Sequence, residues 1–216
     1  MRTLTLIISW TLTLLYQSVL ADTIEDFGKQ MTYFYLSPTQ ESFNSFQRNA
    51  DRFRDELVGG KNGADLLVTV MIARISQMYH WPTIESAFSE PAKEIAHGKT
   101  PLAKYIQDDS QVDPKKLDVW WASFFATGDE NYLNSIFQFA GQELPRGDLG
   151  KMLVVGAATW SFKSNCTQHR KVLEFVKQKL SSHSLSKAQT NFANECIRLA
   201  ESQDRRPGIS EPKPKI

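Results

Sequence analysis

Residues 113–140 read DPKKLDVWWASFFATGDENYLNSIFQFA, a stretch whose helix signals decide the fold class. Asp113 before Pro114 is a strong helix start, because the carboxylate can cap free backbone N–H groups and proline suits the first helical turn. Gly128 is expected to end this helix, and Asp129 to cap a second helix with one apolar face. Two helices joined by so short a turn pack antiparallel, so the stretch predicts a helical hairpin.

The same helical spacing of apolar residues recurs along most of the chain, and no stretch alternates convincingly over the length of a strand. We therefore predict an all-α fold for residues 22–202. It is expected to be a single multi-helix bundle, or an array of antiparallel helix pairs, with about nine helices. Residues 65–79 and 149–162 are apolar around most of the helix circumference, so both segments are expected to be enclosed helices.

Amphipathic helices are expected to surround this enclosed pair. One begins near Ser37, where hydroxyl residues and a proline resemble a helix cap, and ends at Gly59. The others are predicted at residues 83–96, 168–183 and 186–202, each with apolar positions three and four apart.

The first 21 residues carry one charge, at Arg2, followed by an apolar run over residues 4–15 and small or apolar residues before Asp22. This order is typical of a signal peptide that is cleaved after Ala21. The run is too short and too rich in Thr and Ser for a comfortable membrane span of about 20 apolar residues. We therefore predict an exported protein, periplasmic or secreted, without a stable membrane span after cleavage. An uncleaved anchor or a buried first helix is the alternative.

The mature chain is expected to be electrically neutral. The whole chain has 25 Lys and Arg against 24 Asp and Glu, and removing the leader takes away one arginine, which leaves 24 of each sign. Nucleic-acid binders neutralise phosphates with clustered basic residues, and attraction to anionic lipid needs a similar surplus. We therefore expect no nucleic-acid partner.

Residues 203–216, in which prolines alternate with charged residues, predict a disordered tail.

The hairpin from Trp120 to Ala140 resembles a tetratricopeptide-type unit, in which a small residue lets two antiparallel helices approach and an aromatic residue follows the turn. Here Gly128 and Tyr132 are four residues apart where that repeat has three, and no repeat of about 34 residues recurs. Residues 120–129 and 159–165 are also similar to segments of uncharacterised exported bacterial proteins. This resemblance implies a helical class and an exported location, and it carries no activity.

Two cysteines in an exported chain predict a disulfide. Cys166 lies near the end of one predicted helix, and Cys196 lies near the end of the helix two elements later. An up-down-up arrangement makes these helices parallel and places both thiols at one end of the bundle. A bridge closing a loop of about 30 residues would contribute roughly 3–4 kcal/mol. Two separate buried thiols are the alternative, since no Cys-x-x-Cys pair indicates metal or redox chemistry.

No motif identifies a catalytic centre, a metal site or a cofactor. The histidines stand apart from one another without metal-ligand spacing, so each is expected to be a cap or a surface residue. They are His80, His97, His169 and His183. Ser184 and Lys187 have the Ser-x-x-Lys spacing of some serine hydrolases, but Ser186 between them fits better as a helix cap. We expect no metal and no cofactor.

Several carboxylates leave an enzymatic function open. An acid and a base facing one cleft carry out hydrolysis in helical glycosidases, although exposed helix faces and caps also explain such residues. The candidates are Glu85, Glu90, Glu94, Asp108 and Asp109. A periplasmic or secreted hydrolase is therefore a second functional hypothesis, and a carrier that holds a small molecule or lipid in an apolar cavity is a third.

Aromatic residues are the most informative candidates for binding. Trp120 and Trp121 point about 100° apart on a helix, so they cannot face in one direction. Either both pack in the core, or one lines an exposed groove of the kind in which interfaces place aromatic side chains. Together with Phe125 and Tyr132, they are the predicted binding residues. The first hypothesis is therefore a module that binds a protein or peptide through this aromatic surface.

Overall fold

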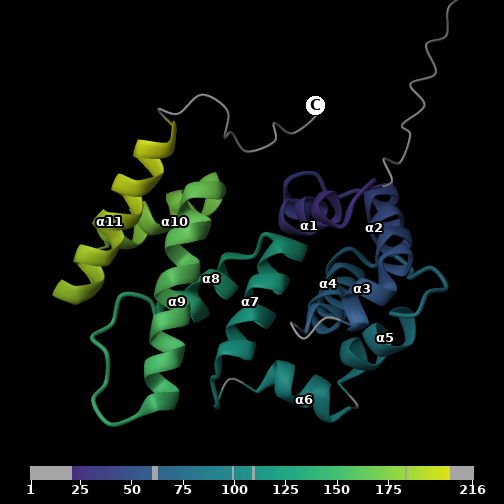
Figure 1. Ribbon diagram of the computed structural model, residues 1–216, viewed down its shortest axis with the longest axis horizontal. Coiled ribbons are helices and arrows are strands. Elements are labelled where there is room, and N and C mark those ends of the chain that lie inside the picture. Colours follow the sequence, from purple (N-terminus) through teal and green to yellow (C-terminus); the bar gives the residue numbers. More distant parts are fainter. Residues whose placement is uncertain (1–20, 60–62, 99, 109, 183, 205–216) are drawn as a thin grey trace, which may run out of the picture.

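A computed structural model describes residues 21–59, 63–98, 100–108, 110–182 and 184–204. In these ranges the chain forms eleven α-helices and one 3-10 helix, without any strand, which confirms the predicted all-α fold (Figure 1). The elements are α1 (Ile24–Thr32), η1 (Phe34–Leu36), α2 (Gln40–Arg52), α3 (Arg54–Gly59), α4 (Ala64–Tyr79), α5 (Ser89–His97), α6 (Pro101–Gln107), α7 (Pro114–Thr127), α8 (Glu130–Phe137), α9 (Leu149–Gln168), α10 (Arg170–Ser181) and α11 (Lys187–Asp204).

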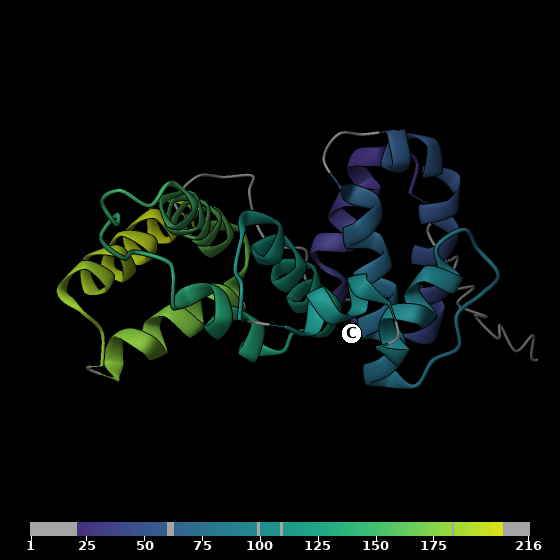
Figure 2. The same cartoon turned by 90° about the horizontal axis from the view of Figure 1, so that it is seen from below.

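The helices form two groups with α7 between them. Helices α1 to α6 lie on one side of α7 and α8 to α11 on the other, and Figure 2 shows the same division from below. Each group has its own hydrophobic core, and α7 contributes to both. Val119 and Ala122 belong to the first core, whereas Leu117 and Phe124 belong to the second. Because opposite faces of α7 are buried in different cores, this helix separates the two cores and contributes side chains to both.

Two helices are enclosed, as predicted, but only one of them is at the predicted position. In α4 the side chains from Val68 to Ala73 are all buried, in agreement with the prediction for residues 65–79. The second enclosed helix is α7, which buries nine of its 14 residues. The prediction of an enclosed helix over residues 149–162 is wrong, because α9 leaves Leu153 and Trp160 55% and 73% exposed. An apolar circumference alone cannot distinguish an enclosed helix from a helix with an uncovered apolar face.

The predicted helical hairpin is present. The Asp113 carboxylate accepts a hydrogen bond from the Lys116 backbone N–H at 2.8 Å, and Asp129 accepts one from Asn131 N–H at 2.9 Å. Gly128 ends α7 with φ +67°, a left-handed conformation that glycine adopts without steric penalty. Local capping chemistry therefore sets both ends of this turn.

Other helix boundaries differ from the prediction. The helix expected from Ser37 to Gly59 is divided at Phe53, and it starts after Thr39, whose hydroxyl accepts the Ser42 N–H in a capping box. The helix expected over residues 83–96 begins only at Ser89. The residues before Ser89 form a loop instead, which is held by hydrogen bonds to side chains of other segments. One of these bonds runs from Ile84 N–H to Gln47 Oε1 at 3.1 Å. Helices α1 and α6 were not predicted.

Both predicted terminal segments fall largely outside the described residues. Of the predicted signal peptide, residues 1–21, only Ala21 is described; it is buried, and its N–H donates to Asn49 Oδ1 at 3.3 Å. Of the predicted tail, Gln203 and Asp204 belong to α11, and residues 205–216 lie outside the description. Within the described ranges, no helix combines the length and hydropathy needed to cross a membrane.

Candidate functional site

A pocket of about 320 Å³ opens where the two groups of helices meet at α7. Its walls come from four helices: Arg74 on α4, Ile106 and Gln107 on α6, Trp120 on α7, and polar residues of α8. The α8 residues are Asn131, Tyr132 and Ser135. We call it the Arg74 pocket, after the one charged residue among its described lining residues. It combines a cation, two aromatic side chains and amide groups, which is a suitable lining for a polar ligand.

The Arg74 guanidinium is held in place by neutral groups. Its carbon lies 5.6 Å from the centre of the Tyr132 ring, within the range of a cation–π contact. Its nitrogens donate to Ser123 Oγ at 3.4 Å and to Gln77 Oε1 at 3.5 Å, both at the long end of hydrogen-bond distances. In the described part of the chain no carboxylate lies within ion-pair distance of it. The guanidinium can therefore take a carboxylate, the partner that its planar donors fit best.

Trp120 forms a fixed part of the pocket wall. It is only 3% exposed, and its ring stacks on Phe139 with centroids 6.3 Å apart. The Lys116 ammonium lies 5.8 Å from the same ring. This lysine is fully buried and donates to the backbone carbonyls of Tyr105, Ile106 and Asp108 at 2.7–2.9 Å. It therefore closes the C-terminal end of α6 against α7.

The four predicted binding residues separate into two pairs. Trp120 and Tyr132 meet at the Arg74 pocket. Trp121 is 5% exposed, and its indole N–H donates to Ser161 Oγ at 3.0 Å, so it packs between α7 and α9. Its ring stacks on Phe125 at 5.7 Å, on the side of α7 away from the pocket. Of the two alternatives for the tryptophans, the structure buries both indoles and leaves a pocket beside one of them.

Arg74 and Lys116 were not identified as site residues from the sequence. One signal was available for Lys116, because it precedes Trp120 by four residues and therefore shares its face of α7. For Arg74, the signal was a single cation inside an otherwise apolar helix. Neither pattern shows that α4 and α8 come together, since Arg74 and Tyr132 are far apart in the sequence.

His169 joins distant parts of the chain. It occupies the cap position between α9 and α10, but its side chain makes no capping hydrogen bond, and at 1% exposure it is not the surface residue that was the alternative. The rings of Tyr33, Tyr35 and Phe125 surround its imidazole with centroids 4.8, 5.8 and 5.2 Å away. Its Nδ1 is hydrogen-bonded to the Tyr35 hydroxyl at 2.9 Å, and its Nε2 has no partner among the described residues. Burial lowers the pKa of His169 to about 4.

The predicted disulfide is absent, and this prediction is corrected. Cys166 and Cys196 are both buried in the second core as free thiols, and their sulfurs are not at bonding distance. The expected proximity is nevertheless found, because both thiols lie in the second core and the Cys196 side chain interacts with the Cys166 thiol. This interaction and then burial raise the pKa of the Cys166 thiol, so it remains protonated. Helices α9 and α11 hold the side chains in contact but do not bring them into bonding geometry.

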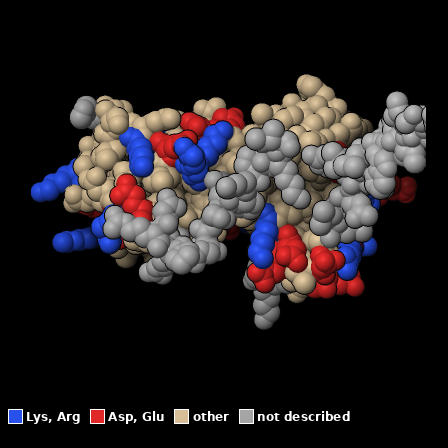
Figure 3. All heavy atoms as spheres, turned by 90° about the horizontal axis from the view of Figure 1, so that it is seen from above, with Lys and Arg blue, Asp and Glu red and all other residues tan. Residues whose placement is uncertain are grey.

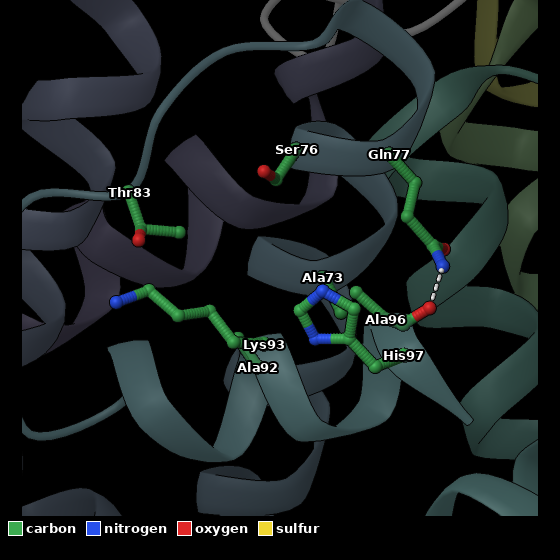
Figure 4. A pocket seen from close by; sticks show the side chains of 8 residues that line it. All are labelled: Ala73, Ser76, Gln77, Thr83, Ala92, Lys93, Ala96 and His97. Atoms are coloured by element: carbon green, nitrogen blue, oxygen red, sulfur yellow. Dashed lines mark hydrogen bonds between the residues drawn. The ribbon is translucent and has the colours of Figure 1, made fainter. Parts of the chain in front are cut away.

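A second pocket, of about 260 Å³, lies between α4 and α5 (Figure 4). His97 and Lys93 line it from α5, and Ser76 and Gln77 from α4. Two of its polar groups are already engaged: Lys93 Nζ contacts Glu90 Oε1 at 2.6 Å, and Gln77 Nε2 donates to the Ala96 carbonyl at 2.9 Å. This pocket therefore has less capacity to hold a charged ligand than the Arg74 pocket.

The carboxylates proposed for hydrolysis do not converge in the pockets described here. Glu90 pairs with Lys93 on the surface of α5, Glu85 and Glu94 are exposed, and Asp109 lies outside the described residues. A third pocket, of about 390 Å³, has one carboxylate, Asp65, among its lining residues.

The Ser186 hydroxyl accepts the Gln189 N–H at 3.2 Å and so caps α11, as predicted. No group of three potential metal ligands occurs among the residues that the structure places.

Comparison with known proteins does not identify a family. No protein-family model matches the chain, and no curated protein and no solved structure matches it significantly. The charge distribution is also unspecific: on the face shown in Figure 3, acidic and basic side chains lie next to one another.

Proposed function

We propose that this chain is an interaction module that binds a carboxylate-bearing peptide segment of another protein in the Arg74 pocket. The observation that carries the proposal is the Arg74 guanidinium, which faces the pocket and whose partners among the described residues are two long, neutral hydrogen bonds and the Tyr132 ring. A carboxylate would replace these with shorter, charge-assisted bonds. The side chains of Ile106 and Trp120 would contact the apolar part of the same peptide.

The location of this function is part of the proposal. The order of charge, apolar run and small residues in residues 1–21 supports export to the periplasm or to the medium. The similarity of residues 120–129 and 159–165 to uncharacterised exported proteins supports the same location. In that case the partner would be a protein of the cell envelope or of the secreted fraction.

Peptide selection followed by charge removal tests the function. A random peptide display library is selected on the immobilised protein, and each selected peptide is then resynthesised with its carboxylates replaced by amides. We expect carboxylates to be enriched, and their removal to weaken binding at least about tenfold, which corresponds to roughly 1.4 kcal/mol. Binding is measured by the fluorescence anisotropy of labelled peptides, because the chain has five tryptophans and the emission of Trp120 cannot be separated from that of the others.

Matched arginine variants locate the binding. Arg74→Met keeps most of the apolar stem and removes the guanidinium, so it should weaken the selected peptides as much as amidation does. Arg54→Met is the control, because Arg54 is exposed and lines a different pocket. If the peptides bind Arg74→Met and the unchanged protein equally, or if none is selected, the proposed function is wrong.

A further inference from the structure

Helix α9 exposes an apolar face that no other part of the described chain covers. Leu149 is 71% exposed, Leu153 is 55% exposed and Trp160 is 73% exposed, and Met152 lies beside them. With Gly156, which is also exposed, these five residues define the α9 apolar face. Their spacing of three and four residues places them in one stripe along the helix.

This face differs from an ordinary exposed helix surface. A surface helix normally places polar and charged residues opposite its buried stripe. The five positions of the α9 apolar face carry no charge, and Lys151 lies beside them in the sequence. Gly156 lies at its middle, and a Cβ built there would meet no atom within 4 Å. Glycine lowers the stability of a helix, so its presence here needs another reason. The open space that it leaves among large apolar side chains would let another chain approach the helix closely.

We propose that the α9 apolar face is the interface of a homodimer, in which the α9 helices of two copies cross antiparallel near Gly156. A two-fold axis between residues 153 and 156 places Leu153 of each copy over the Gly156 notch of the other. The same axis places Trp160 of each copy opposite Leu149 of the other. Each large side chain thus meets either a notch or an apolar partner, which makes the face complementary to itself.

The exposed area is sufficient for a dimer. With about 200 Å² for each large side chain when fully exposed, the four large residues of the face expose roughly 500 Å² in each copy. Two copies would therefore bury about 1,000 Å² before any flanking polar residue is counted, which reaches the lower limit for a specific interface. Indole groups such as that of Trp160 are typical of the residues that dominate binding energy.

The charges beside the face favour a second copy over an anionic lipid surface. Lys151 pairs with Asp148 at 3.2 Å, and Lys163 pairs with Glu195 at 2.7 Å, so both basic side chains that flank the face are neutralised by acidic partners. Binding to anionic lipid relies on unpaired basic residues next to the apolar face. The chain has a formal net charge of +1, so two copies barely repel each other. The inference does not depend on the Arg74 pocket, because α9 contributes no residue to it.

Sedimentation velocity of the purified protein at increasing concentration tests the proposal. We expect a monomer–dimer equilibrium that lies on the dimer side at about 100 μM, where complexes with micromolar Kd are formed. Gly156→Arg fills the notch with a long charged side chain, and Leu153→Asp places a charge at the crossing point. Each should weaken dimerisation at least tenfold.

Two controls separate loss of the interface from loss of the fold. Gly156→Arg should leave the thermal unfolding midpoint of the monomer unchanged or raised, since arginine is the better helix former. Val58→Asp introduces the same charge at an exposed apolar position on α3 and should leave the dimer intact. A protein that is monomeric at every concentration, or a dimer that Gly156→Arg does not weaken, overturns the proposal. A monomer that binds phosphatidylcholine vesicles through Trp160 also overturns it and assigns the face to lipid.

Discussion

His169 shows how strongly a single residue can connect this fold. Its imidazole contacts Tyr33 and Tyr35 from the N-terminal region and Phe125 from α7, while its backbone belongs to the junction of α9 and α10. An uncharged imidazole is tolerated in this apolar environment, whereas an imidazolium would be buried among aromatic rings without solvent. The residue is therefore a sensitive point of the fold on the acidic side of neutral pH.

We predict that His169 destabilises the fold as the pH falls below about 6.5. Its pKa is lowered to about 4 in the folded chain, against 6.5 for the free side chain, so the unfolded chain takes up the proton first. The contribution of the neutral imidazole is complete above pH 6.5, decreases as the pH falls to 4, and stays lost below that. A shift of this size corresponds to roughly 3 kcal/mol in the free energy of unfolding.

Urea unfolding of the unchanged protein and of His169→Gln between pH 7.5 and about 4 measures this contribution. The variant should be less stable at neutral pH, because the contacts of the imidazole are lost, but its stability should fall less steeply with acid. The carboxylates titrate in both proteins, so the difference between the two curves isolates His169. Parallel curves would show that its protonation is not suppressed by folding.

At the scale of the elements, the turn between α7 and α8 and the exposed stripe of α9 use glycine for opposite reasons. Gly128 has φ +67°, and a Cβ there would come within 3.3 Å of Lys171 Nζ and 3.4 Å of Tyr35 Cβ. Gly156 lies inside a regular helix with open space where its Cβ would be. Only the first position requires glycine for the fold of the monomer.

The same substitution at these two positions should therefore have opposite effects. Gly128→Ala should lower the free energy of unfolding by about 1–2 kcal/mol, because an L-residue is strained in the left-handed region. Gly156→Ala should raise it by roughly 0.5–1 kcal/mol through better helix propensity. Thermal unfolding of the two variants, at a concentration low enough to keep the chain monomeric, compares them directly. Equal shifts in one direction would contradict this account of the two glycines.

The sequence predicted those elements whose ends depend on local chemistry. Asp113, Gly128 and Asp129 marked the hairpin correctly because a cap acts over a few residues. The division at Phe53 and the late start of α5 at Ser89 were missed, since side-chain bonds between separate segments determine them. Two of the four predicted binding residues, Trp120 and Tyr132, line the Arg74 pocket. Arg74 was recognisable as a single cation in an apolar helix, but only tertiary packing shows that it lies beside them.

The whole molecule is organised around α7. One face of this helix packs against α1 and α4, and the opposite face packs against α8 and α9. Removing either group of helices would expose a buried face of α7 together with the core behind it. The two cores are therefore expected to be interdependent in stability.

We predict that the protein unfolds in one cooperative transition. Phe43→Ala in the first core and Phe162→Ala in the second core each delete a fully buried ring, which typically costs about 3–5 kcal/mol. Both variants should shift the same transition when unfolding is followed by far-UV circular dichroism and by tryptophan fluorescence. Two separate transitions, with each variant moving only one of them, would show that the cores unfold independently.

The buried amine of Lys116 has a consequence for the response of the protein to ionic strength. The ion pairs at Lys29, Lys93 and Lys151 are exposed, so dissolved salt screens them and removes most of their small contribution. The ammonium of Lys116 is fully enclosed and bound to three backbone carbonyls, where counter-ions have little access. The contacts at the junction of α6 and α7 should therefore keep their strength at salt concentrations that screen the surface ion pairs.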